Sequence, residues 1–158
     1  MRILKHTGLV QAPREQIFAL LEDARQADRL TPPFLDIEVE RSPWMPKVGD
    51  RTRLSIRHRG TGVALETELV EYRRGFFLLE RQVDGPFVSF EHAVNLDDAR
   101  DDTEAAAAGG ATSVTEVLAY QLPFRWLGAL FDRVSLRRDL DTLLRTRITR
   151  LRELLQAD

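Results

Sequence analysis

Apolar residues in the last quarter of the chain recur at steps of three and four, from about Phe124, just after Pro123, to Leu155. This spacing places them on one stripe of a helix, whereas the arginines and acidic residues between them read as a solvated face. A helix of about 30 residues would be about 45 Å long, so we expect one large surface to pack along it. The stripe comprises Leu127, Leu130, Phe131, Val134, Leu140, Leu144, Ile148, Leu151 and Leu155.

The hundred residues before this helix mostly alternate between apolar and polar positions in short runs, which is typical of strands. Strands are expected at 3–10, 35–41, 51–59, 63–69, 76–83, 87–96 and 112–122. Pro13 fits the first turn of a short helix, and a second short helix from about Ala24 to Leu30 ends at Thr31-Pro32-Pro33. The predicted fold class is α+β: a seven-stranded antiparallel curved sheet around the long C-terminal helix, with two short helices after the first strand. We expect one domain spanning 1–158, in which 97–111 is a flexible loop.

Charged residues alternate along two neighbouring predicted strands. Arginines stand at 51, 53, 57 and 59, and glutamates at 66 and 68. Antiparallel pairing would set them against each other as cross-strand ion pairs, which we favour over a nucleic-acid patch. The net charge of −2 also gives the whole chain no strong field for nucleic acid or an anionic membrane.

Composition excludes several classes of chemistry. The absence of cysteine excludes disulfides, thiolate catalysis and Cys-ligated zinc, and no two of the three histidines have metal-ligand spacing. The nucleophile elbow, the dinucleotide fingerprint and the P-loop are all missing, so neither a metal nor a cofactor is expected. No signal peptide is visible and no apolar run is long enough to span a membrane, so a soluble, cytoplasmic protein is the expectation.

The candidate polar site centres on His92 and Glu116. Each lies on the apolar, inward-looking face of its predicted strand. Pairing Leu96 with Thr112 would set His92 directly opposite Glu116, although a shift of two residues would make the pair diagonal. A buried imidazole beside a carboxylate would be protonated and the carboxylate ionised. Such a pair could fix the register of the sheet, orient the polar end of a ligand, or act as a catalytic acid and base.

Further side chains could join this site. Glu80 and Gln82 share one strand face, and they reach the interior only if that face, rather than the other, points inward. Tyr120 could add a hydroxyl, Phe90 shares the face of His92, and Phe131 lies on the helix stripe. Phe34, Trp44 and Phe87 could stand at the mouth of a cavity, although ordinary core packing would explain each equally well. The candidate ligand-binding set is Glu80, Gln82, Phe90, His92, Glu116, Tyr120 and Phe131.

Three segments carry a resemblance to a known superfamily: residues 30–33 (LTPP), residues 82–87 (QVDGPF) followed by Glu91-His92, and residues 115–124 (TEVLAYQLPF). Together with Ala12-Pro13 and Ile17-Phe18, they resemble the START/SRPBCC superfamily over essentially the whole chain. Within it, they are similar to the bacterial polyketide cyclase/dehydrase-like branch that is related to cell-division inhibitors. The resemblance implies a helix-grip fold with a deep, largely apolar cavity, but no single activity.

Three functions remain open. The first is binding of a small hydrophobic or amphipathic ligand, such as a lipid, an isoprenoid or a polyketide-like aromatic, between sheet and helix. The second is a cyclase, dehydrase or hydrolase in which His92 is the acid and base and Glu116 orients it. The third is a module that binds a partner protein. An oligomer is possible, whereas nucleic acid and integral membrane association are not expected.

Overall fold

The computed structural model describes residues 1–99, 110–124 and 133–156, with the side chains of 133 and 134 left aside. Its strands form one antiparallel sheet of seven in the order β1-β7-β6-β5-β4-β3-β2, which confirms the predicted fold class. The strands are β1 (Arg2–Val10), β2 (Leu35–Arg41), β3 (Arg51–His58), β4 (Thr61–Arg73), β5 (Phe77–Asp84), β6 (Ser89–Asp98) and β7 (Thr112–Gln121). The helices are α1 (Arg14–Glu22), the short 3₁₀ helix η1 (Ala24–Gln26), α2 (Ala27–Leu30) and α4 (Arg133–Leu155).

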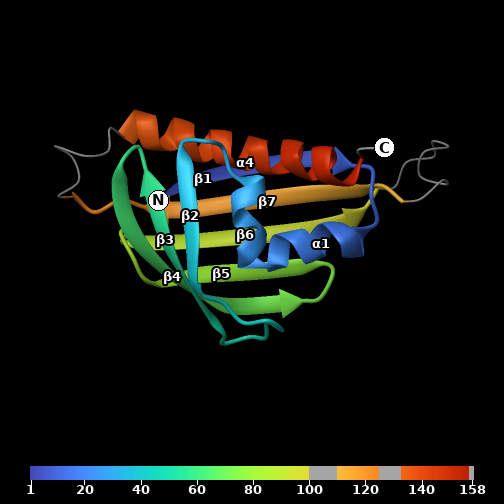
Figure 1. Ribbon diagram of the computed structural model, residues 1–158, viewed down its shortest axis with the longest axis horizontal. Helices are drawn as coiled ribbons and strands as arrows, with labels where there is room; N and C mark the ends of the chain where they lie inside the picture. Colours follow the sequence, from blue (N-terminus) through green and yellow to red (C-terminus); the bar gives the residue numbers. More distant parts are fainter. Residues whose placement is uncertain (100–109, 125–132, 157–158) are drawn as a thin grey trace.

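The sheet curls strongly around its helices. In Figure 1, β2 and β3 run across the direction of β6 and β7, while α4 lies lengthwise along the β1 and β7 side. Helix α1 contacts β6 and α4, and α2 also contacts α4. The two small helices therefore fill the space between the long helix and the curled strands. None of the described helices is long and apolar enough to cross a membrane.

The long helix is described over 23 residues, from Arg133 to Leu155, which corresponds to about 35 Å. Its inner face buries Leu136, Leu144, Ile148 and Leu151. The ring of Phe124, where the helix was expected to start, is exposed. The expected helical positions 127, 130 and 131 lie outside the described residues. The expected loop at 97–111 is shorter than predicted at its start, because Asp97 and Asp98 still belong to β6, and its residues 100–109 lie outside the described part.

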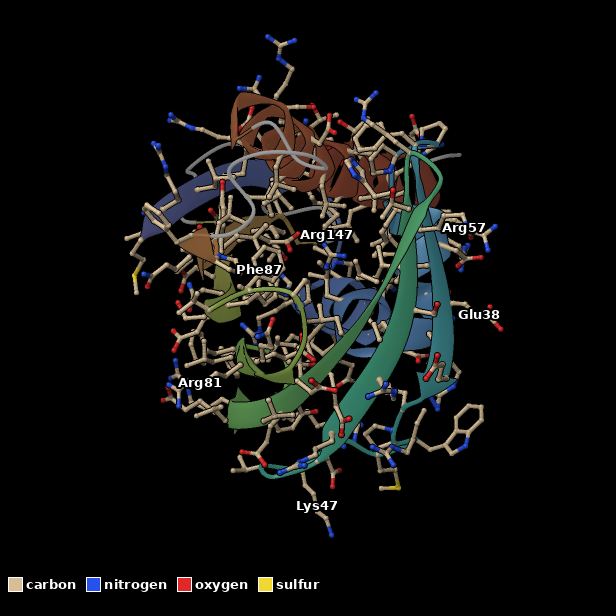
Figure 2. All side chains as sticks on the ribbon, turned by 90° about the vertical axis from the view of Figure 1, so that its left-hand side faces the viewer. Glu38, Lys47, Arg57, Arg81, Phe87 and Arg147 are labelled. Carbon is tan, nitrogen blue, oxygen red and sulfur yellow. The ribbon has the colours of Figure 1, made fainter. Side chains whose placement is uncertain are left out.

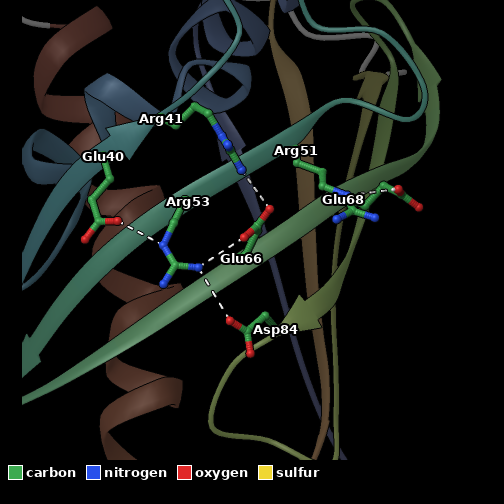
Figure 3. A network of polar contacts seen from close by, with 7 residues as sticks. All are labelled: Glu40, Arg41, Arg51, Arg53, Glu66, Glu68 and Asp84. Atoms are coloured by element: carbon green, nitrogen blue, oxygen red, sulfur yellow. Dashed lines mark hydrogen bonds and ion pairs between the residues drawn. The ribbon is translucent and has the colours of Figure 1, made fainter.

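The hairpin of β3 and β4 confirms the predicted cross-strand pairing for Arg51 and Arg53, whereas Arg57 lies opposite Gly62. Arg51 lies opposite Glu68 and Arg53 opposite Glu66, with ion-pair distances of 3.5 and 3.1 Å. Figure 3 shows that Arg53 also reaches Glu40 and Asp84, and that Glu66 also binds Arg41. The arginine side chains are partly exposed, so solvent screens these contacts and each adds little stability, although together they fix which residues of β2 to β5 face each other.

Two residues form the tip of this hairpin, and the backbone explains their positions. Arg59 and Gly60 have φ angles of 48° and 84° between the paired residues His58 and Thr61. Two consecutive positive φ angles are typical of a type I′ turn, whose twist matches that of the flanking strands. Arg59 was expected in the strand but lies in the turn after β3, away from the other arginines. Its side chain binds Asp139 of α4.

Helix α4 approaches β1 closely at Gly8. A Cβ atom at Gly8 would lie 2.6 Å from the Cγ2 atom of Ile148, which is a buried core residue. Real Cβ contacts are essentially never that short. The backbone of β1 at Gly8 therefore lies too close to the Ile148 side chain of α4 for any residue larger than glycine. Gly62, in the exposed hairpin, has nothing within 4 Å of the same position.

We predict that Gly8→Ala lowers the free energy of unfolding by about 1–3 kcal/mol, because it overpacks the contact between β1 and α4. Gly62→Ala is the matched control, and its effect should stay within about 0.5 kcal/mol. Urea unfolding of the two variants measures both values. Equal stabilities of the two variants would contradict the close contact at Gly8.

Candidate ligand-binding site

A pocket of about 210 Å³ lies between the curled sheet and α4. Its wall is mostly apolar, with leucine and isoleucine side chains from β2, β3 and β4, Phe90 from β6, Leu118 from β7 and leucines of α4. Residues of α1, η1 and α2 close one side. The apolar wall includes Ile56, Leu65, Phe90, Leu118, Leu140 and Leu144.

Three charged side chains form a layer beside this pocket, and two of them line it. Glu116 of β7 is fully buried, and its Oε2 atom lies 2.8 Å from Nε2 of His92 on β6. Nε of Arg147 on α4 donates to the same carboxylate at 2.8 and 3.0 Å. His92 and Arg147, whose side chains are 14 and 11 % exposed, line the pocket, whereas the candidate residue Glu116 lies behind them and is not part of its wall. We call these three residues the charge layer.

The charge layer separates two clusters of core residues. On β7, Val114 belongs to one cluster and Leu118 to the other, with Glu116 between them. On α4, Ile148 belongs to the cluster of Val114 and Leu144 to the cluster of Leu118, with Arg147 between them. The three elements therefore place their charged residue at one level of an otherwise apolar interior.

The register assumed from the sequence is wrong by two residues, although the predicted contact forms. Val94, rather than His92, lies opposite Glu116, and His92 lies opposite Leu118. A long connection joins β6 to β7, so turn geometry does not constrain the register, and a shift of two keeps every side chain on its face. His92 and Glu116 are diagonal neighbours, which long side chains can still bridge.

The pKa values of Glu116 and His92 shift in the directions that the sequence predicted for a buried carboxylate–imidazole pair. Burial alone would raise the pKa of Glu116, but Arg147 and then His92 outweigh this and hold the pKa below its ordinary value. Burial would likewise lower the pKa of His92, but the hydrogen bond to Glu116 and the nearby carboxylate of Glu80 outweigh it and raise the pKa. An ionised carboxylate thus sits between two cations.

Glu80 and Gln82, whose inward or outward direction was open, behave differently. Glu80 lies directly opposite His92 and lines the pocket, with Oε2 at 3.7 Å from Nδ1 of the imidazole. Gln82 instead uses its amide to bind the backbone of Phe87, donating to its carbonyl at 2.8 Å and accepting from its N–H at 3.2 Å. It holds the turn before β6 and is not part of the pocket wall.

Some of the remaining candidate residues line the pocket and others do not. Phe90 lines the pocket, whereas Tyr120 is fully buried in the adjacent core cluster with its ring 5.9 Å from that of Phe87. Phe131 lies outside the described residues. Of the three aromatic residues expected at the mouth, Phe87 lines the pocket, and Phe34 packs edge-on against His58. Trp44 is 84 % exposed, stacks under Arg25 and does not contribute to the pocket wall.

Sequence reasoning missed a second polar cluster on the pocket wall. Asp139 of α4 is buried, with Oδ2 2.7 Å from Nε2 of His58 and both oxygens bound by Arg59. Hydrogen bonding to Arg59 lowers the pKa of Asp139 and outweighs the effect of burial. These contacts connect the tip of the β3–β4 hairpin to α4.

Arg147 and Asp139 were both assigned to a solvated face because of their residue type. Their positions carried a signal that the assignment ignored. Arg147 is three residues after the stripe position Leu144 and directly before Ile148, and Asp139 directly precedes Leu140. Charged residues next to an apolar stripe on a long helix are candidates for buried pairs.

Among the described residues, no group of three or more His, Asp or Glu side chains could hold a metal ion.

We predict that stability depends on pH through the charge layer. His92 binds its proton more tightly in the folded protein, so its contribution is complete below its unfolded pKa, near 6.5, and is lost as the pH rises through the raised folded pKa. Glu116 and Asp139, with lowered pKa values, contribute above their unfolded pKa values and lose this contribution as the pH falls through the folded ones.

Urea unfolding at a series of pH values measures this profile. His92→Gln should flatten the decline on the alkaline side, because it removes the imidazole whose pKa is raised in the folded protein. A parent protein whose unfolding free energy does not fall above pH 6.5 would show that the imidazole is not held protonated.

The comparisons with known proteins bear on the fold. No model of a protein family matches the chain, and no curated protein matches it. Among solved structures, a protein of Chromobacterium violaceum superposes with a TM-score of 0.71 at 14% identity, covering 99% of this chain and 98% of the other. A START superfamily protein of Mycobacterium smegmatis gives 0.68 at 13% identity, covering 98% and 97%.

The major latex-like protein 151 of Panax ginseng gives a TM-score of 0.60 at 16% identity and covers 92% of this chain and 93% of its own. Identities this low show a shared fold and carry no activity with them. Together with the strand order and the long C-terminal helix, they show that the chain has the START-like helix-grip fold.

Proposed function

We propose that the protein holds a small hydrophobic or amphipathic molecule in the pocket between the sheet and α4, with the charge layer facing its polar end. The observation that carries the proposal is a group of buried charges at the wall of an otherwise apolar pocket of about 210 Å³. A cavity of about 150 Å³ is large enough for benzene, so the space suits a molecule of modest size. The START-like fold supports the same proposal.

Both parts of the site would contribute to binding. Burial of the apolar body of the ligand contributes roughly 25 cal/mol per Å². Association and ordering cost part of this gain, so the affinity depends on how well the polar end is satisfied. A few polar groups in an apolar pocket are the usual source of orientation and selectivity.

We predict that filling the pocket abolishes binding without unfolding the protein. Ile56 lines the pocket from β3 and is only partly buried, so Ile56→Trp should place its indole in the space that a ligand needs. Leu9→Trp, at a 40 % exposed position of β1, is the matched control. Native mass spectrometry of the purified proteins, compared with denatured spectra, should show a bound mass in the parent and in Leu9→Trp but not in Ile56→Trp.

Titration with an apolar fluorescent naphthalene dye gives a second readout that does not depend on what is carried through purification. The dye should bind the parent and the control and should fail to bind Ile56→Trp. A parent that carries no mass and binds no dye would contradict the proposed function.

A second proposal is catalysis, and one observation favours it. His92 lies between Glu116 and Glu80 and faces the pocket, and its raised pKa suits a proton donor. An enzyme of the polyketide cyclase/dehydrase-like branch, or a hydrolase, would use it in this way. Buried carboxylate–histidine pairs also serve structure alone, so we rank this proposal second.

Substitution of the pair separates the two proposals. Under the first, His92→Gln and Glu116→Gln should each weaken ligand binding modestly, by about tenfold or less. Under the second, turnover should collapse while affinity is mostly retained. Calorimetric titration with the co-purified ligand, followed by product detection after incubation, measures both. Variants that bind like the parent and yield no difference in product would leave the pair with a structural role only.

A further inference from the structure

The free end of the Arg147 side chain is unused by the protein. Both contacts with Glu116 are made through Nε, and among the described residues Nη1 and Nη2 have no hydrogen-bond partner. The side chain nevertheless lines the pocket and is only 11 % exposed. Figure 2 shows it extending from α4 into the interior between helix and sheet. Four N–H donors of the guanidinium are therefore unused by the described residues, on a side chain that lines the pocket.

The charges around this group do not balance within the buried layer. Arg147 and the protonated His92 supply two positive charges, and Glu116 supplies one negative charge. Glu80 is nearby, but its side chain is 31 % exposed and lies 3.7 Å from the imidazole, beyond a good hydrogen bond. Solvent screens its charge more than that of the buried groups, so Glu80 offsets the second positive charge only in part.

The other acidic groups of the pocket wall are already engaged. Asp139 is bound by His58 and Arg59, Glu22 accepts from the hydroxyl of Tyr72 at 2.5 Å, and Asp23 binds Arg25 at 3.0 Å. Arg59 and Arg25 offset the charges of Asp139 and Asp23, which would otherwise repel an anion, whereas the hydroxyl of Tyr72 is neutral and only holds Glu22 in position. The pocket therefore presents one strong, unused donor group in an apolar surrounding.

We propose that Arg147 selects the polar end of the ligand, and that this end is a carboxylate bound by Nη1 and Nη2. The proposal rests on the proposed function and narrows it, because the ligand is then an amphipathic monocarboxylic acid. A guanidinium presents paired N–H groups that match the two oxygens of a carboxylate, and charge-assisted pairs of this kind are stronger than neutral hydrogen bonds. The contact with Glu116 holds Arg147 in place before the ligand arrives.

The test compares naphthoate with naphthamide, which have the same shape and differ in charge. Calorimetric titration at neutral pH should show that the parent binds naphthoate at least about tenfold more tightly, which corresponds to about 1.4 kcal/mol. Arg147→Lys keeps a cation beside Glu116 but removes the paired donors, so its preference should fall to about twofold or less. Arg145→Lys is the matched control, since Arg145 is 65 % exposed and pairs with Asp141 on the outer side of α4.

A further variant keeps the test decisive if Arg147→Lys unfolds. Glu80→Gln removes the nearby negative charge and should tighten naphthoate binding by about twofold or more without affecting naphthamide. Equal affinities of the parent for the two probes, or a preference retained in Arg147→Lys, would overturn the carboxylate proposal while leaving the ligand-binding function intact. Binding of neither probe, together with the absence of a bound mass in native spectra, would overturn both.

Discussion

The fully buried carboxylate of Glu116 constrains the rest of this structure. An ionised carboxylate without partners in an apolar interior is too costly to persist, so it must be met by donors at fixed positions. Those donors come from His92 on β6 and Arg147 on α4. Removing one partner of such a group typically costs about 3–5 kcal/mol, because the remaining charge is left buried. The two strands and the long helix can therefore pack together in only one relative position.

A similar constraint acts nearer the start of α4. Asp139 is held there by His58 and Arg59 at the tip of the β3–β4 hairpin. Asp139 and Arg147 are eight positions apart, which is about 12 Å along a helix. The helix is thus fixed to the curled end of the sheet at one point and to its central strands at another. Residues of both contacts line the pocket, so the charges that fix the helix also determine the chemistry of the space beneath it.

Much of the fold could be predicted because each element carries its own local signal. Alternation identified the strands, and steps of three and four identified the final helix. The facing of arginines and glutamates on β3 and β4 also followed, because both rows alternate on one strand face, and the two-residue turn that the structure shows sets Arg51 opposite Glu68. The register of β6 and β7 had no such constraint, and there the assumed pairing of His92 was wrong by two residues.

The candidate site was predictable in part for the same reason. His92 and Glu116 stood out as polar residues on apolar strand faces, where a change of type is conspicuous. Arg147 and Asp139 did not, because a helix rich in charged residues surrounds them with side chains of the same kind. Tertiary contacts alone decide which of those charges turns inward. Gln82 shows the converse, since it was grouped with Glu80 as a candidate ligand-binding residue but its amide binds a neighbouring turn.

The charge layer also divides the interior into two apolar parts, and α4 contributes to both of them. One part combines α1, β6, β7 and the end of the helix at Ile148 and Leu151, and the other gathers around Leu4, Tyr120, Leu136 and Leu144. A change of side-chain volume in one part is therefore accommodated mainly by neighbours on the same side of the layer, because the buried ions cannot shift without weakening their contacts.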